Sequence, residues 1–407
     1  MPAISIFSSA FCRTGQVIQD LCASTDYPVV GDAEIIADAS KLSGIAAEKI
    51  ARAFKSRTSV FNKFTREKEC SVAYLKLATA KRLAADKLII NGFSSQLIPD
   101  NLTHLLRVAL IGDAAYRVAV AKETQALSAR EARKKMRGDD ENCAAWIDFL
   151  HRTHQDCWDP GRFDLFIPMH KTSVEQAGAW IEENVLKPVL ESTEASRQLM
   201  HDFLMAAAVE VALAREGHTV DVVAQGSSIT LSLQKQVLML SRLEDELRSI
   251  AGKVGGVESV VVKTGHGYHQ ANIYRKHDFS MPSRVLLVDD ERDLAQTLSE
   301  RLQMRDMGSA VAYDGASALQ LVEDDEPEVM IIDLKMPGID GLQVLREVKA
   351  TRPEIEVIIL TGKGTEADEA QCKELGAFGY LQKPVDIEQL SRMLKEAHRQ
   401  IERRRSK

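Results

Sequence analysis

The clearest hydrophobic pattern in this 407-residue chain lies in its C-terminal third. Three runs, at 285–288, 329–332 and 357–360, are apolar at every position instead of alternating with polar residues. Such runs are typical of parallel strands that are covered on both faces. The pattern therefore predicts an α/β fold for this part of the chain.

Acidic residues stand where two of these predicted strands end. Asp289 and Asp290 follow the first run, and Asp333 follows the second. Ligands of open α/β sheets bind at the carboxyl ends of the strands, so we expect the three carboxylates to converge there. Mg²⁺ prefers oxygen ligands and would relieve the repulsion among them. The sequence thus predicts a magnesium site.

A hydroxyl group and a lysine follow the next two predicted strands. Thr361 comes directly after the run 357–360, and Lys383 follows the segment 378–381. A bound Mg²⁺ with a nearby cation and hydroxyl group can neutralise a phosphoryl group that arrives at one carboxylate. These residues therefore indicate a site for phosphoryl chemistry.

With these five strand-end features in order, residues 283–400 resemble the receiver domain of response regulators in two-component signalling. The resemblance implies a flavodoxin-like fold with strand order 2-1-3-4-5 and a phosphoryl group accepted by Asp333. It also implies further roles for the surrounding residues: Mg²⁺ ligands Asp289, Asp290, Asp333 and the carbonyl of Lys335, phosphoryl contacts Thr361 and Lys383, and the aromatic switch Tyr380. The alternative is an acidic α/β domain that is not phosphorylated.

The N-terminal part begins with another predicted strand–loop–helix unit. Residues 3–9 read as a buried strand, 10–14 as a loop, and Gly15 opens a helix. Phosphate-cradling loops occur at this position because loop amides and a helix N-terminus point at the anion. Such loops carry several glycines and a cation, whereas this one has only Gly15 and Arg13.

Further predicted strands at 87–92, 105–111 and 162–167 complete a resemblance to the cytidylate-kinase-like family of P-loop proteins over about 3–186. In the first loop, members of the family have Gly-Ser-Gly-Gly-Arg, whereas residues 12–16 of this chain are Cys-Arg-Thr-Gly-Gln. In the lid element, the family has an arginine at the position of Cys143. The resemblance implies these nucleotide-binding candidates: Arg13, Thr14, Gly15 and Arg117.

Phosphoryl transfer depends on positioning and cationic stabilisation. The resemblance implies a P-loop-like three-layer domain. Because the loop glycines are missing and Cys143 replaces the arginine of the family's lid, we expect this domain not to be an enzyme. An active kinase is the alternative. The three tryptophans, Trp146, Trp158 and Trp180, are interpreted as core residues, and the basic cluster 130–137 either as a solvated helix face or as a phosphate-facing lid.

The segment between these regions predicts a small α+β domain. A helix over 187–217, a hairpin over 220–233 and a helix over 235–251 precede strands at 257–263 and about 271–275. This order resembles a BON-like module, with a plain α+β spacer as the alternative. His266 and His269 are interpreted as solvated, with metal binding as the alternative. The expected domains are 1–190, 191–276 and 283–402.

Composition narrows the choice of function. The six cysteines show no CxxC spacing, no run reaches 18 apolar residues, and the N-terminus lacks a signal-peptide pattern, so we expect a cytoplasmic protein with reduced thiols. Residues 283–400 carry 24 acidic against 14 basic side chains, whereas 1–282 are balanced. That balance, with no helix-turn-helix pattern after residue 400, argues against DNA binding.

The expected function is that of a response regulator, phosphorylated on Asp333, that controls the output of a non-catalytic N-terminal domain. The expected partners are a sensor histidine kinase or phosphotransfer protein, a nucleotide at the N-terminal domain, and a second copy of the chain through the receiver. The rival hypothesis is a nucleotide kinase gated by the receiver.

Overall fold

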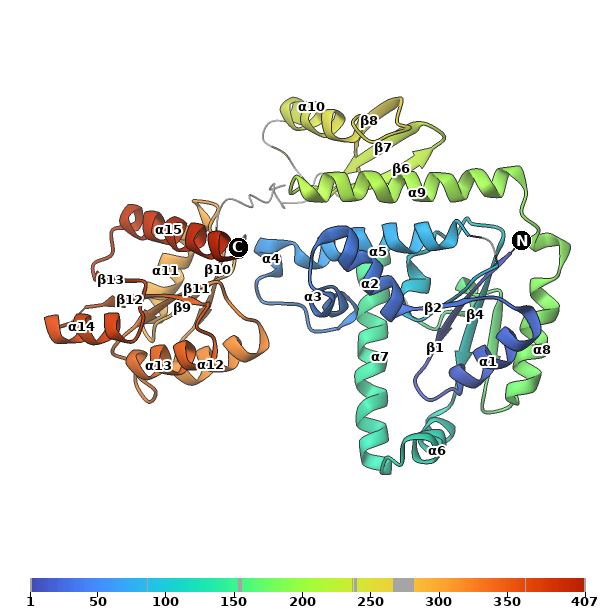
Figure 1. Ribbon diagram of the computed structural model, residues 1–407, viewed down its shortest axis with the longest axis horizontal. Coiled ribbons are helices and arrows are strands. Elements are labelled where there is room, and N and C mark those ends of the chain that lie inside the picture. The colour runs from blue at the N-terminus through green and yellow to red at the C-terminus, as the bar shows by residue number, and fades with distance from the viewer. Residues whose placement is uncertain are drawn as a thin grey trace. The chain divides into compact units, whose positions relative to one another are not determined.

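The computed structural model describes residues 2–85, 87–152, 156–235, 237, 240–265, 282–362 and 364–405 (Figure 1). The chain forms two compact units. The first comprises residues 1–58 and 68–275, and the second comprises 59–67 and 276–407. The predicted strand at 271–275, His266 and His269 lie outside the described residues.

The first unit is built on a parallel five-stranded sheet of order β2-β3-β1-β4-β5. Its central strand β1 alternates its side chains between two hydrophobic clusters: Ala3 and Phe7 enter one, and Ile4 and Ile6 enter the other. This two-sided burial gives three layers, because helices must cover both faces. The strands are β1 (Ala3–Ser8), β2 (Val29–Gly31), β3 (Ile89–Asn91), β4 (Leu105–Ile111) and β5 (Leu165–Pro168).

Helices α1 and α8 supply one of these clusters, and α2, α5, α7 and α9 supply the other. Side-chain caps begin several of them: Asp113, Ser128 and Ser173 each accept a hydrogen bond from a first-turn amide. The main helices are α1 (Thr14–Thr25), α2 (Asp32–Ser43), α3 (Ala47–Ala51), α5 (Glu67–Leu83), α6 (Ala114–Gln125), α7 (Ala129–His151), α8 (Val174–Val185) and α9 (Glu194–Arg215).

Helix α9 packs on two sides. Phe203 and Ala207 enter the cluster beside the five-stranded sheet, whereas Val209 and Leu213 enter a separate cluster. That second cluster lies on a three-stranded sheet in which β7 pairs antiparallel with β6 and parallel with β8. These elements are β6 (Asp221–Gln225), β7 (Ser228–Leu233), α10 (Leu240–Ala251) and β8 (Ser259–Thr264). The predicted α+β character of this segment is present, and its BON-like resemblance stays a prediction.

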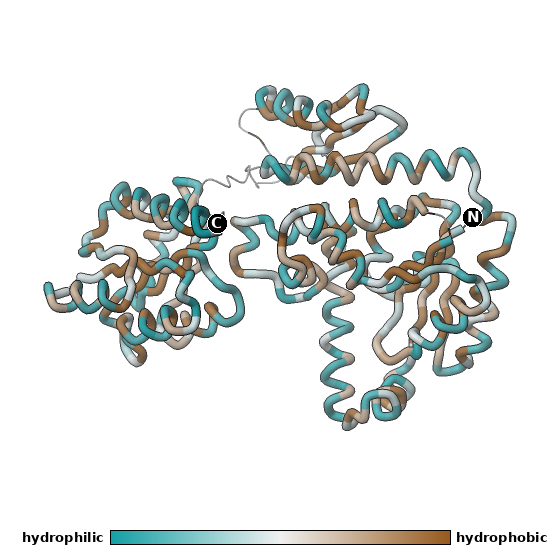
Figure 2. Tube along the Cα trace, viewed as in Figure 1, coloured by the Kyte–Doolittle hydropathy of each residue, from teal (hydrophilic) through white to brown (hydrophobic). Residues whose placement is uncertain are grey.

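The second unit contains a parallel sheet of order β10-β9-β11-β12-β13. In order along the chain this is 2-1-3-4-5, the flavodoxin-like arrangement predicted from the sequence. The strands are β9 (Val285–Val288), β10 (Ser309–Ala312), β11 (Val329–Asp333), β12 (Glu356–Thr361) and β13 (Gly379–Gln382). They show as hydrophobic interior segments in Figure 2.

Helices cover both faces of this sheet. The cluster on one face takes residues from α12, α13 and α14, and the cluster on the other takes residues from α11 and α15. The continuous apolar runs follow from this, since successive residues of β11 alternate between the two clusters. The helices are α11 (Arg292–Gln303), α12 (Gly315–Asp324), α13 (Gly341–Thr351), α14 (Glu366–Glu374) and α15 (Ile387–Arg405).

The prediction that all three tryptophans are core residues is wrong for one of them. Trp146 is 1% exposed, and Trp158 is partly buried against Phe7. Trp180, in contrast, is 46% exposed, because Ala177 and Ile181 are the residues through which α8 packs on the sheet.

We predict that Gly341→Ala destabilises the second unit. A Cβ atom at Gly341 would lie 2.1 Å from the Asp333 carbonyl oxygen and 2.8 Å from Leu334 Cα. Backbone atoms cannot yield as a flexible side chain does, so we expect a loss of about 1–3 kcal/mol. The matched control is Gly362→Ala, whose Cβ would meet Lys383 at an ordinary 3.9 Å. Hydrogen exchange over β11 in the full chain measures both, and equal protection in the two variants would contradict the prediction.

Candidate functional site

Three carboxylates meet at the carboxyl edge of the C-terminal sheet. Asp289 and Asp290 directly follow β9, and Asp333 is the last residue of β11, the neighbouring strand. Oxygen atoms of the three lie within 4.8 Å of one another. Asp289 and Asp333 are buried and Asp290 is partly exposed. Parallel pairing of β9 with β11 therefore brings together three acids that are up to 44 positions apart in sequence.

Lys383 places its ammonium group among these acids. Its Nζ atom lies 2.8 Å from Asp289 Oδ2, 3.1 Å from Asp333 Oδ2 and 3.4 Å from Glu291 Oε1. Burial by itself lowers the pKa of Lys383, but the hydrogen bonds and charges of Asp289 and Asp333 outweigh burial and raise it. The lysine is therefore charged at neutral pH.

The surroundings of the Asp333 carboxylate act on it in opposite directions. Burial raises its pKa, although the hydrogen bond and charge of Lys383 act in the opposite direction. Within the described part of the chain, its Oδ1 atom is buried and has no hydrogen-bond partner. One lysine facing three carboxylates leaves net negative charge and an oxygen that can accept a further ligand. This donor set suits a hard divalent cation.

Thr361 is the last residue of β12, and Tyr380 lies on the neighbouring strand β13, where it pairs with Ile359. Thr361 is 1% exposed. A Cβ atom built at Gly364 would come within 1.6 Å of the Tyr380 hydroxyl oxygen and 2.7 Å of Thr361 Cγ2. The Tyr380 hydroxyl is therefore directed inward against the loop after β12, and among the described residues it is buried without a hydrogen-bond partner.

The loop between β1 and α1 in the first unit keeps unusual backbone geometry without the expected glycines. Phe11 and Arg13 have φ values of 63° and 54°. This left-handed region is costly for residues with a Cβ atom. Thr14 and Gly15 begin α1, and a Cβ atom at Gly15 would have open space around it.

The two basic nucleotide-binding candidates, Arg13 of this loop and Arg117 of α6, are already paired with acids. Arg13 forms an ion pair with Glu123 and donates to Gln16 Oε1 at 3.2 Å. Arg117 is buried and donates to Asp140 through both terminal nitrogens, at 2.8 and 3.0 Å. Its Nε atom also donates to the Ala10 carbonyl, which holds the loop in place. These contacts neutralise both cations.

Cys143, which stands at the expected arginine position, lies inside α7 and is 4% exposed. The neighbouring Cys157 thiol and burial raise the pKa of Cys143. A neutral buried thiol cannot supply the positive charge that an arginine would. The basic residues at 130–137 of α7 have exposed side chains, consistent with a solvated helix face: Arg130, Arg133, Lys134, Lys135 and Arg137.

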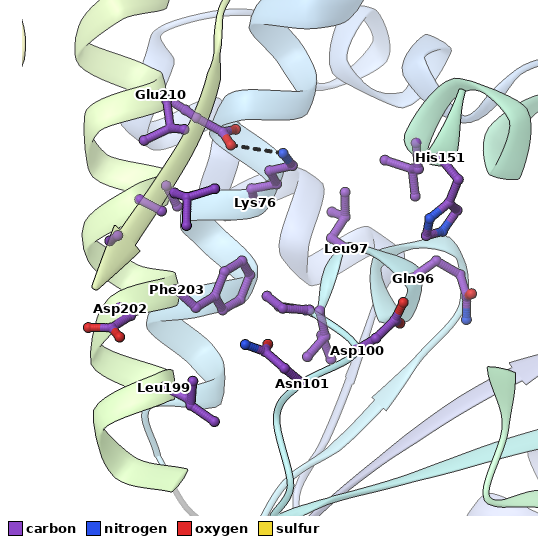
Figure 3. A pocket seen from close by; sticks show the side chains of 18 residues that line it. Lys76, Gln96, Leu97, Asp100, Asn101, His151, Leu199, Asp202, Phe203 and Glu210 are labelled. Atoms are coloured by element: carbon purple, nitrogen blue, oxygen red, sulfur yellow. Dashed lines mark hydrogen bonds and ion pairs between the residues drawn. The ribbon is translucent and has the colours of Figure 1, made fainter. Parts of the chain in front are cut away.

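Sequence reasoning did not single out a pocket of about 380 Å³ that the first unit forms beside α9 (Figure 3). Its walls come from α5, the segment 96–101, α9 and β6. Some polar groups of the walls bond to protein partners: Lys76 to Glu210 at 3.0 Å, and Asp202 to the Gly226 amide at 2.9 Å. The pocket lies where α9 packs against α5 and the segment 96–101, and no sequence motif marks this position.

Comparison with known families agrees with this geometry. Residues 285–395 match the family model of the response regulator receiver domain, and residues 3–171 match that of the cytidylate kinase-like family. The chain carries a cytidylate kinase-like domain and, C-terminal to it in the sequence, a receiver domain. The receiver domain holds the carboxylate cluster, and the kinase-like domain holds the loop with Arg13.

Curated relatives match through the receiver domain. The response regulator MprA of Mycolicibacterium vanbaalenii is 34% identical over 110 residues, which are 27% of this chain and 48% of the relative. MprA of Mycobacterium bovis is 32% identical over the same length. The chain thus spans about half the length of these relatives.

Solved structures match the same region. A Francisella response regulator receiver domain is 28% identical and covers 28% of this chain and 96% of its own, with a TM-score of 0.28. The chemotaxis protein CheY4 of Vibrio cholerae is 29% identical over 28% of this chain and 96% of its own, with a TM-score of 0.27.

In the described part of the chain, no helix is both long and apolar enough to cross a membrane.

We predict that Gly364→Ala expels the Tyr380 hydroxyl from the receiver interior, because the new methyl group would occupy its position. Fluorine NMR of protein labelled with fluorotyrosine measures the change, and Tyr380→Phe assigns the resonance. The signal should move toward the value of a solvent-exposed tyrosine. The control Gly362→Ala should leave it in place, and an unmoved signal in Gly364→Ala would contradict the inward geometry.

Proposed function

We propose that this protein is a response regulator that receives a phosphoryl group on Asp333. The observation that carries the proposal is the buried Asp333 carboxylate, which shares the sheet edge with two further acids and the Lys383 ammonium group. The match of residues 285–395 to the receiver family supports it. The donor would be a phosphohistidine of a sensor kinase or phosphotransfer protein.

The transfer would form one bond and break one. A carboxylate oxygen of Asp333 forms a P–O bond while the donor's P–N bond breaks, and the electron pair returns to the imidazole nitrogen. Lys383 already lies 3.1 Å from Asp333 Oδ2, so its charge can stabilise the incoming phosphoryl oxygens. Thr361, at the end of the adjacent strand, would donate its hydroxyl to another of these oxygens.

We assign the carboxylates of Asp289, Asp290 and Asp333, with the carbonyl of Lys335, as the ligands of Mg²⁺. When bound, this ion would neutralise negative charge on the phosphoryl group. Asp333 Oδ1, buried without a hydrogen-bond partner in the described structure, supports this assignment. The ion would also offset the repulsion that three acids and one lysine leave unbalanced.

The phosphoryl group would be sensed by Thr361 and Tyr380. New acceptor oxygens beside Thr361 favour one position of its side chain, and the packing of Tyr380 against the same loop links the two. The surface of α14, β13 and α15 would then present two shapes. We expect a second copy of the receiver to bind one shape preferentially, which shifts the population by its differential affinity.

We expect Asp333→Asn to abolish labelling of the full chain by acetyl phosphate in Mg²⁺, because the nucleophilic carboxylate is gone. Chelation of the metal should suppress labelling of the unmodified protein. The control is Asp306→Asn, an exposed acid on a turn with φ of 59°, where asparagine is well tolerated. Phosphorylation is measured on acid-labile phosphate gels, and labelling that survives Asp333→Asn would refute the assignment.

For the kinase-like domain we propose an output role without catalysis. A working phosphate loop needs backbone amides in close approach and free positive charge. Here Arg13 is paired with Glu123, Arg117 with Asp140, and a neutral thiol stands at position 143. The second candidate function is a receiver-gated cytidylate kinase, which the family match over 3–171 and the left-handed geometry at Phe11 and Arg13 favour.

Incubation of the full chain with ATP, Mg²⁺ and CMP or dCMP separates the two candidates. We expect no nucleoside diphosphate above the buffer control, with or without beryllofluoride at the receiver, because the cations of the loop are neutralised. Chromatography measures the product. Robust turnover that depends on beryllofluoride would establish the gated kinase instead.

A further inference from the structure

A short segment of the kinase-like region belongs to the same compact unit as the receiver. Residues 59–67, here called the strap, lie within the 3–171 family match, yet they group with residues 276–407. The strap contains the one-turn helix α4 (Asn62–Thr65) and ends on Glu67, the first residue of α5. The rest of α5 belongs to the first unit.

The strap contributes a core residue to the receiver. Phe61 is 0% exposed and belongs to the hydrophobic cluster that contains Leu286 of β9 and Met330 of β11. The Arg284 guanidinium lies over its ring, 5.4 Å from the centroid. A phenylalanine that is fully removed from water is an anchor and not an incidental surface contact.

Polar bonds fix the strap on both sides of Phe61. The Val60 amide donates to Asp325 Oδ2 at 2.7 Å. At the other end, Glu67 Oε2 accepts a hydrogen bond from Arg284 Nη1 at 3.0 Å, and Arg284 Nε donates to the Glu326 carbonyl at 3.1 Å. The Arg284 side chain is 9% exposed, so loss of Glu67 would leave a largely buried charge without this carboxylate.

The receiver has a glycine, Gly308, where the strap passes close to its backbone. Gly308 precedes β10, and a Cβ atom there would lie 2.0 Å from Phe64 Cγ and 2.3 Å from Phe64 Cβ. These atoms are near the strap backbone, so rotation of the ring cannot relieve the overlap. A side chain at position 308 is therefore incompatible with the observed path of the strap.

All of these contacts lie at the amino ends of the strands. Arg284 immediately precedes β9, Gly308 immediately precedes β10, and Asp325 lies in the connection that leads into β11. Asp289 and Asp333 lie at the opposite, carboxyl ends of β9 and β11. The strap therefore leaves the proposed phosphorylation site open.

We propose that residues 59–67 are a built-in ligand of the receiver domain at the amino edge of its sheet. The strap inserts Phe61 into the receiver core, and Asp325 and Arg284 of the receiver bond to it. The receiver is then attached through this contact as well as through the continuous chain. Glu67 pairs with Arg284 and is also the first residue of α5, the helix whose Leu75 and Ala78 are in the core of the first unit.

Hydrogen exchange on the full chain tests this proposal with matched pairs of variants. Phe61→Ala removes the anchor, whereas Val60→Ala truncates a neighbouring side chain that is 38% exposed. Asp325→Ala removes the acceptor, whereas Glu323→Ala removes an exposed acid of the same helix end. We expect exchange over 59–67 to rise on the order of tenfold or more in the first member of each pair and to stay unchanged in the second.

Gly308→Ala tests the same contact from the receiver side. We expect faster exchange over 59–67 and faster tryptic cleavage after Lys63 and Arg66, with β11 still protected and acetyl phosphate labelling intact. Gly362→Ala is the control. If residues 59–67 exchange as fast as an unstructured peptide in the unmodified protein, or if Phe61→Ala and Gly308→Ala leave their exchange unchanged, the proposal is overturned.

Discussion

The ion pairs of Lys383 with Asp289 and Asp333 are the interaction on which the chemistry of the receiver depends. Two like charges about 4 Å apart repel by about 4 kcal/mol at an effective dielectric constant of about 20. Three carboxylates within 4.8 Å can therefore share one sheet edge only with compensating charge. Lys383 supplies part of it, and the remainder suits a divalent cation and, in turn, a phosphoryl group that this cation helps to neutralise.

In the kinase-like domain, the charges of the candidate nucleotide-binding residues are already paired. Arg13, in the loop between β1 and α1, is paired with Glu123, and Arg117 of α6 is paired with Asp140. The acids satisfy the arginines in the absence of any ligand. A nucleotide phosphate would therefore meet two arginines that already have carboxylate partners.

Helix α9 joins the two sheets of the first unit. Helix α9 buries Phe203 beside the five-stranded sheet and Val209 beside the three-stranded one, so the kinase-like domain and the small sheet share a helix. Within the second unit, the strap contributes Phe61 to the core of the receiver.

The sequence by itself located the receiver strands β9, β11 and β12 and the polar residues at their ends, because parallel strands buried on both faces leave continuous apolar runs that end in polar side chains. The strand order followed from the resemblance to receiver domains. Local signals also placed β4 and the start of α8, where Ser173 caps the helix. Only the tertiary structure decided the ion pairs of Arg13 and Arg117, the exposure of Trp180 and the burial of Phe61. These depend on contacts between residues up to about 270 positions apart, and the periodicity of a single segment carries no information about such partners.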